Sequence, residues 1–346
     1  MLDEIKNKLE EELSCLMHGL DRIYSLNKIS PLLSKSIKEF VLRRGKRARP
    51  LLFVVGYLGF SKKPSYGLYA SALSLELLHD FMLVHDDIID KSDTRRGKPS
   101  MHTLLNNHLK KYRGIKFNGQ DLAIAAGDVI YALALRAFFM IKENPLNKEK
   151  AFKKLIRATV YTGSGEFIEL LCGTKDIANI KKEDIYKIYD LKTADYTFAS
   201  PLAIGATLAG AGKTETDRLF KYGLYLGRAF QIKDDILGIF ADQKQTGKSA
   251  LTDLKEAKKT ILIWQAYRNC GDKDKRTIEN TFTRQRVGKS DLLKMRLIIR
   301  KSGALDYAKK EIRQLVQKAS CVMASSRLSV PYKKLLEKYA QDILEL

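Results

Sequence analysis

The stretch "FMLVHDDIID" (Phe81–Asp90) joins an apolar run directly to three aspartates. Apolar residues usually enter a protein core, where neighbouring like charges are costly. On a helix, Asp86 and Asp90 are four residues apart and Asp87 and Asp90 are three apart, so the carboxylates share one face. We expect a cation to offset their repulsion. Mg²⁺ is suitable because it binds one or two carboxylates together with substrate phosphates.

A second stretch, "FQIKDDILG" (Phe230–Gly238), repeats the arrangement with Asp234 and Asp235. Asp234 lies 148 residues after Asp86, so only the tertiary fold can bring the two aspartate groups together. The first group alone could be a negatively charged helix end, and the second group weakens that alternative. Neither stretch has the alternating oxygen ligands of a Ca²⁺-binding loop. The two stretches therefore favour magnesium.

Basic residues accompany both acidic stretches. Arginines bind diphosphates through bidentate hydrogen bonds, and a bridging metal adds to this binding. The sequence therefore predicts a ligand with a diphosphate head and an apolar tail, which explains why an apolar helix ends in aspartates. The basic candidates are Arg95 and Arg96 after the first stretch, Lys248 and Lys258 after the second, and Lys46 and Arg49 in "RRGKRARP".

Periodicity predicts helix nearly throughout the 346 residues, with apolar positions three and four residues apart. We expect one all-α domain over residues 1–346, with ten or more helices. Residues 269–291 are the most polar break and are predicted to be the least structured segment. The apolar stretch Leu122–Ile141 has the length of a membrane span. It contains Asp128 and Arg136, which favours a buried core helix.

The formal net charge is +22, with 62 basic and 40 acidic residues. Such a balance suits an anionic partner, or simply a lysine-rich surface. No arginine-rich arm or zinc pattern marks a nucleic-acid reader, so we expect no nucleic-acid partner. Weak contact with a membrane surface stays open. Four cysteines without close spacing favour reduced thiols, and the N-terminus lacks the apolar centre of a signal peptide; both favour a cytoplasmic protein. We expect no transmembrane segment, because the longest apolar stretch is interrupted by charged residues.

The sequence resembles the trans-isoprenyl diphosphate synthases, the family of farnesyl and geranylgeranyl diphosphate synthases, with an archaeal-like pattern. The resemblance runs from about Gly45 to the end of the chain and rests on both aspartate stretches. It also includes "GKRARP", "ELLHD", "TRRGKPSMH", "LKTADYTFASP" and "TDLKEAKKT". It implies an all-α isoprenoid synthase helical bundle around a central cavity, and a homodimer. It also implies a transferase that condenses isopentenyl diphosphate with dimethylallyl, geranyl or farnesyl diphosphate.

The resemblance also implies roles for individual residues. Lys192, Thr193 and Gln231 would be catalytic and would contact the allylic diphosphate. Two or three Mg²⁺ ions would be bound by Asp86, Asp87, Asp90, Asp234 and Asp235. The allylic diphosphate would further be held by Arg95, Lys248 and Lys258. Isopentenyl diphosphate would be held by Lys46, Arg49, His79 and Arg96.

Three departures from the family pattern are visible. Gly238 stands where the second stretch of many relatives has a third aspartate, and Glu166 and Glu169 replace a glutamine and an aspartate. The chain also ends in "DILEL", without the basic tail that some relatives have. None of these changes removes a residue that the mechanism requires.

Product length is the finest prediction. Phe81 and Met82, five and four residues before Asp86, would set the floor of the pocket, with Leu78 as an alternative floor. An aromatic residue stands at the fifth position before Asp86 but not at the fourth, and "DDIID" has no insertion. This combination is similar to the archaeal pattern of synthases that make geranylgeranyl diphosphate. A farnesyl diphosphate synthase or a bifunctional enzyme is the alternative. A terpene cyclase would not need Lys46, Arg49, His79 and Arg96, and an inactive partner subunit would have degraded aspartate motifs.

Overall fold

The computed structural model describes residues 1–241, 254, 256–284 and 286–345. Contacts divide the chain into two compact units, residues 1–152 with 205–210 and residues 153–204 with 211–346. The two units are described separately below. The organisation as one domain over residues 1–346 stays a prediction.

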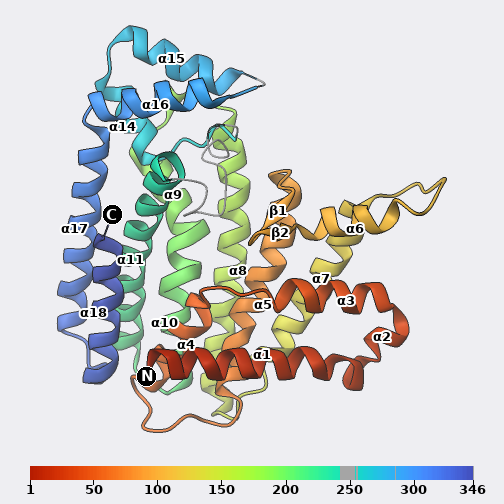
Figure 1. Cartoon of the computed structure of the whole chain (residues 1–346). Helices are drawn as coiled ribbons and strands as arrows, with labels where there is room; N and C mark the ends of the chain where they lie inside the picture. The colour runs from red at the N-terminus through yellow and green to blue at the C-terminus, as the bar shows by residue number, and fades with distance from the viewer. Residues whose placement is uncertain (242–253, 255, 285, 346) are drawn as a thin grey trace. The chain divides into compact units, whose positions relative to one another are not determined.

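The first unit is built from helices and one short hairpin (Figure 1). In chain order its elements are α1 (Leu2–Tyr24), α2 (Leu26–Ile29), α3 (Pro31–Val41), α4 (Ala48–Leu58), α5 (Leu68–Ile89), β1 (Thr94–Arg95), β2 (Lys98–Pro99), α6 (Met101–Leu109) and α7 (Gly119–Phe138). Two helices, α8 (Pro145–Gly173) and α10 (Ser200–Leu208), contribute residues to both units.

Helix α5 is the core of the first unit. Leu73, Leu77 and Val84 are fully buried, and the helix packs mainly on α7. The hydroxyl of Ser71 donates to the carbonyl of Phe138, 2.8 Å away, and so fastens the start of α5 to the end of α7. A helix that is apolar on nearly all sides must be enclosed by its neighbours. The partly exposed aspartates of the motif come at its C-terminal end, whereas Glu76 and Asp80 in its middle are buried.

The hairpin that follows α5 positions two arginines. Thr94 pairs with Pro99, and Arg95 pairs with Lys98 in antiparallel register. The two residues of the turn, Arg96 and Gly97, have φ values of 54° and 72°. Two positive φ values in a two-residue turn are typical of the type I′ hairpin. The sequence pattern predicted only a break here, because two residues per strand are too few for a visible alternation.

The second unit is all helical within its described residues. Its elements are η1 (Ile177–Asn179), α9 (Lys182–Tyr189), η2 (Asp190–Ala199), α11 (Lys213–Phe240), α14 (Ile261–Asn269), α15 (Asp272–Thr283), α16 (Lys289–Lys301), α17 (Ala304–Ala324) and α18 (Val330–Leu344). Helix α11 packs against η2, α17 and α18. The hydroxyl of Tyr222 on α11 donates to the carbonyl of Leu336 on α18 at 2.8 Å.

Segment η2 is a π-helix, a wide and rare form that is often found at functional sites. It packs very closely on α11. A Cβ atom at Gly227 would lie 2.4 Å from the Cα of Ala194, so only glycine fits at this position. The close packing holds the start of η2, which carries Lys192 and Thr193, against the middle of α11.

One sequence prediction about the fold is wrong. Residues 269–291 were expected to be the least structured segment, but α15 occupies much of it. Acidic residues Asp272 and Asp274 lie in the first turn of α15, where their negative charges interact favourably with the helix dipole and stabilise the helix. Ile278 and Thr281 are buried against neighbouring helices. Two buried residues in a polar stretch were too weak a signal for the sequence pattern.

The stretch Leu122–Ile141 is largely a helix of the first unit, as predicted, but only one face of it is buried. Helix α7 contains most of it, and Ala126, Ile130 and Ala134 on this helix are buried in the first unit. No helix among the described residues combines the length and the apolar character that crossing a membrane requires.

Candidate active site

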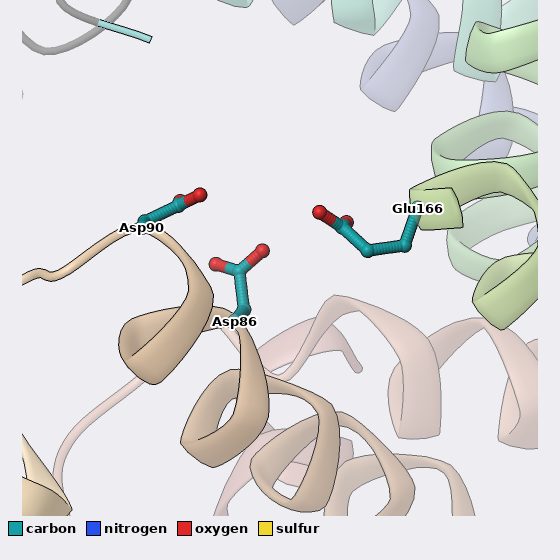
Figure 2. Close-up of side chains that lie close together, drawn as sticks. All are labelled: Asp86, Asp90 and Glu166. Carbon is teal, nitrogen blue, oxygen red and sulfur yellow. The ribbon is translucent and has the colours of Figure 1, made fainter. Parts of the chain in front are cut away.

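The first aspartate group lies at the C-terminal end of α5. Asp86 and Asp90 project from neighbouring turns, and an oxygen of each lies within 4.8 Å of the other (Figure 2). Both side chains are partly exposed, whereas Asp87 is fully buried. Glu166, also labelled in Figure 2, belongs to α8. Two hard oxygen donors at this separation fit a divalent cation such as Mg²⁺.

Arg95 is bound to this aspartate group. Its Nε donates to Oδ1 of Asp87 at 2.7 Å, and one terminal nitrogen donates to Oδ2 of Asp86 at 3.1 Å. A second terminal bond reaches Asp87. The Arg95 side chain is only 10 % exposed. Burial lowers the pKa of Arg95, but its bonds to Asp87 and the neighbouring carboxylates outweigh this effect and raise it. The guanidinium is therefore permanently charged and fixed in direction.

The predicted isopentenyl diphosphate residues lie in the same unit. Lys46 is exposed, whereas Arg49, His79 and Arg96 are half-buried. Burial, followed by the positive charges of Arg49 and Arg96, lowers the pKa of His79 well below its usual value. His79 is therefore neutral at pH 7. A neutral imidazole surrounded by arginines can bind an anion through one N–H group.

A buried charge network supports these residues, and it was not predicted from the sequence. Arg47 donates to Glu76 at 2.6 Å and to Glu10 at 2.8 Å. Arg96 lies 3.5 Å from Glu76 and 3.6 Å from Asp80. Glu76 and Asp80 are four residues apart on an apolar helix, which was the available signal. The pairing with Arg47 and Arg96 depends on the tertiary fold.

Asp80 has the least favourable environment of the residues in this network. It is fully buried, and neither of its oxygens accepts a hydrogen bond among the described residues. Burial and the nearby Glu76 carboxylate raise the pKa of Asp80 well above its usual value, against the opposing effect of Arg96. The network thus holds Arg96 in place at the cost of an unfavourable buried carboxyl group.

The second aspartate group lies on α11 in the second unit. Asp234 is exposed and Asp235 is buried. Gln231 donates to Oδ1 of Asp235 at 2.9 Å, and the hydroxyl of Tyr189 donates to Oδ2. The hydroxyl of Thr193 donates to Oε1 of Gln231 at 2.7 Å. A chain of hydrogen bonds therefore links the predicted catalytic residues Thr193 and Gln231 to one aspartate of the motif.

Lys192 lies between two glutamates of α8. Its Nζ is 2.5 Å from Glu169 and also forms an ion pair with Glu166. Both glutamates are positions where the sequence departs from the family pattern, and the structure brings both to Lys192. Lys258 forms an ion pair with Glu256 at 2.6 Å. Lys248 lies outside the described residues.

The whole chain was compared with protein-family models, with the sequences of known proteins and with solved structures. The model of the polyprenyl synthetase family matches residues 30–297. The chain belongs to the polyprenyl synthetase family. It is 33% identical to the geranylgeranyl diphosphate synthase of Sulfolobus acidocaldarius, over 84% of both chains. It is also 33% identical to the geranylfarnesyl diphosphate synthase of Aeropyrum pernix, over 84% of this chain and 87% of that one.

The comparison of structures agrees with the family. The geranylgeranyl pyrophosphate synthase of Corynebacterium glutamicum, in complex with isoprenyl diphosphate and magnesium, superposes with a TM-score of 0.91. The two sequences are 26% identical, and the match covers 100% of this chain and 99% of that one. The predicted family, the all-α fold and the short-chain prenyltransferase activity are confirmed. The roles of the individual site residues stay predictions.

Proposed function

We propose that this polyprenyl synthetase condenses isopentenyl diphosphate head to tail with allylic diphosphates, and that its main product is geranylgeranyl diphosphate. The observation that carries the proposal is the end of α5, where paired carboxylates and a fixed guanidinium follow an apolar helix. Such an end suits a substrate with a diphosphate head and a hydrocarbon tail. Farnesyl diphosphate as a released intermediate is the alternative product.

Asp86, Asp90 and Asp234 are the carboxylates best exposed to hold Mg²⁺, two or three ions in all, with Asp87 and Asp235 behind them. When bound, Mg²⁺ neutralises the diphosphate leaving group. Arg95, Lys192 and Lys258 add positive charge for the allylic diphosphate. Lys46, Arg49, His79 and Arg96 bind the diphosphate of isopentenyl diphosphate.

In the reaction, the allylic C–O bond breaks and leaves an allylic carbocation. The double bond of isopentenyl diphosphate attacks it and a C–C bond forms. The new carbocation then loses a proton to the released diphosphate, which restores a double bond. Thr193 and Gln231 present oxygen atoms beside the reacting carbons, in an orientation fixed by Asp235. The protein contributes charge stabilisation and exclusion of water, without a protein nucleophile.

The test is synthesis of prenyl diphosphates by the purified protein from labelled isopentenyl diphosphate, an allylic primer and Mg²⁺. We expect chain extension that stops when Mg²⁺ is chelated. Absence of Mg²⁺-dependent extension, together with an Asp86→Ala variant that behaves like the wild type, would contradict the proposal.

Product length depends on the helical turn before Asp86. Phe81 is half-buried, and its ring lies 4.6 Å from the ring of His85 and 5.2 Å from that of Tyr131 on α7. These two contacts fix the orientation of the ring, which supports Phe81 as the floor. Leu78 is fully buried, and Met82 is half-buried. The relatives include synthases of both geranylgeranyl and geranylfarnesyl diphosphate at the same sequence identity. The proposed product length therefore rests on Phe81, Met82 and Leu78.

Chromatography of the products tests the floor. Phe81→Ala should lengthen them, because the ring no longer blocks the growing chain, and Met82→Phe should shorten them towards fifteen carbons. Leu83→Ala, a half-buried neighbour on another face of α5, is the matched control. An unchanged product distribution in Phe81→Ala would remove Phe81 as the floor and leave Leu78 as the candidate.

We also propose a homodimer in the cytoplasm. On α8, Val160, Phe167 and Leu171 are 57%, 64% and 51% exposed and share one face of the helix. An exposed apolar face of this kind suits a second copy of the chain. All four cysteines are free, as expected in a reducing compartment. A sedimentation measurement on Phe167→Asp, which should give monomers, tests the dimer.

A further inference from the structure

The connection between α6 and α7 is a basic loop with exposed apolar side chains. Nine consecutive residues, 110–118, are exposed, and their sequence is "KKYRGIKFN". Lys110, Lys111, Arg113 and Lys116 supply four positive charges, and residues 106–120 contain no acid. Figure 1 draws this segment as a loop that extends beyond the ends of α6 and α7.

Three apolar side chains lie among these cations. Tyr112, Ile115 and Phe117 are 51%, 40% and 47% exposed. The side chain of Lys111 lies over the Tyr112 ring at 5.1 Å, and the ring of His108 lies 6.1 Å from it. Large apolar side chains usually avoid water unless a partner covers them. Here they have no acidic neighbours in the loop, so a partner must accept both apolar groups and positive charge.

The base of the loop is fixed. The amide of Gly119 donates to Oδ1 of Asn106 at 2.7 Å, which joins the start of α7 to α6. A Cβ atom at Gly119 would lie 2.3 Å from the carbonyl oxygen of His102, so the two helices approach as closely as a glycine allows. Gly114 reverses the chain at the tip with a φ of 71°. The fixed base presents the tip away from the body of the first unit.

We propose that the loop of residues 110–118 docks the enzyme on an anionic lipid surface. Interleaved cations and apolar side chains are the chemistry of interfacial anchors: the cations approach lipid phosphates and the apolar groups enter the headgroup region. Stacking on nucleic-acid bases could use the rings of Tyr112 and Phe117 but not the aliphatic Ile115, whereas a lipid surface accepts all three side chains. The inference is consistent with the proposed function, since a prenyl diphosphate is itself an amphiphile. It can be tested without any substrate.

The experiment is cosedimentation of the full chain with vesicles of phosphatidylcholine, with and without phosphatidylglycerol. The wild type should bind only the anionic vesicles and should be released by salt. Each cation near a lipid surface contributes about a fivefold increase in affinity. The variant K110S/K111S/R113S/K116S should therefore bind several hundredfold more weakly, by the same order-of-magnitude reasoning.

A matched control removes the same charge elsewhere. Lys221, Lys310, Arg313 and Lys318 are all exposed in the second unit, and K221S/K310S/R313S/K318S should retain most of the vesicle binding. Equal losses in the two quadruple variants would show that net charge alone acts, and would overturn the proposal. Unchanged binding in the loop variant would overturn it as well.

A second measurement follows insertion of the tip. The single tryptophan, Trp264, lies in the second unit, so W264F with F117W places one fluorophore in the loop. Its emission should shift to the blue with anionic vesicles and stay unchanged with neutral ones. Absence of any shift would contradict apolar insertion. Loop-dependent binding to duplex RNA at physiological salt, without vesicle binding, would assign the loop to nucleic acid instead.

Discussion

Asp87 in the first unit and Asp235 in the second are both buried members of the two aspartate motifs, but different kinds of group contact them among the described residues. Asp87 is bonded to the guanidinium of Arg95. Asp235 accepts hydrogen bonds from two neutral side chains, Gln231 and Tyr189. A buried ion pair is costly to break on one side, whereas a neutral hydrogen bond contributes less. The first motif should therefore be the more sensitive to loss of a partner.

The largest effect is expected from Arg95→Leu. It leaves the fully buried Asp87 without its guanidinium, which should lower the free energy of unfolding by about 3–5 kcal/mol. Urea denaturation measures this loss. The double variant R95L/D87N should recover most of it because no buried charge remains. Equal losses in the single and double variants would show that packing, rather than charge, dominates at Arg95.

The next largest effect is expected when Asp86, which is partly exposed, or Asp234, which is exposed, is replaced. Asp86→Ala and Asp234→Ala should each lower the rate of prenyl transfer by about 10²–10³-fold, because a site for charge stabilisation is removed. Asp93→Ala and Asp217→Ala are controls, since both side chains are exposed and have no proposed role. Initial rates at saturating Mg²⁺ provide the measurement. A loss of only a few-fold in Asp234→Ala would confine metal binding to the first motif.

Tyr189→Phe should have a smaller effect. It removes one neutral donor from Asp235 and also the acceptor of the Ile261 amide, 2.9 Å away. The free energy of unfolding should fall by about 1–3 kcal/mol, less than in Arg95→Leu. Denaturation of Tyr161→Phe, which changes an exposed ring in the same unit, is the control. A loss as large as that of Arg95→Leu would mean that the two motifs are equally dependent on their partners.

The last prediction concerns pH. The pKa of Asp80 is raised in the folded protein, so the folded state binds more protons than the unfolded state, and stability is lost as pH rises above the usual value of 3.8. Asp80→Asn does not titrate. Its stability relative to the wild type should increase from pH 5 to pH 8, by at most about 1.4 kcal/mol for each pH unit. A constant difference, measured by urea denaturation at both pH values, would contradict this.

Much of this site could be predicted because its signals are local. Asp86 and Asp90 share a face through helical spacing alone, and their position after an apolar run indicates the end of a buried helix. The buried network could not be predicted, because Arg47 is 29 residues from Glu76 and meets it only in the folded unit. The π-helix η2 also has no local signal. Its form depends on packing against α11.

The close contact at Gly227 has a consequence for engineering this enzyme. Libraries that vary Phe81 or Met82 change half-buried side chains, and half-buried positions usually accept more residues than fully buried ones. At Gly227, even a methyl group would meet the backbone of η2 at 2.4 Å, so every other residue must push the segment that carries Lys192 and Thr193. Selections for new product lengths should therefore retain glycine at this position, although it is remote in sequence from the residues being changed.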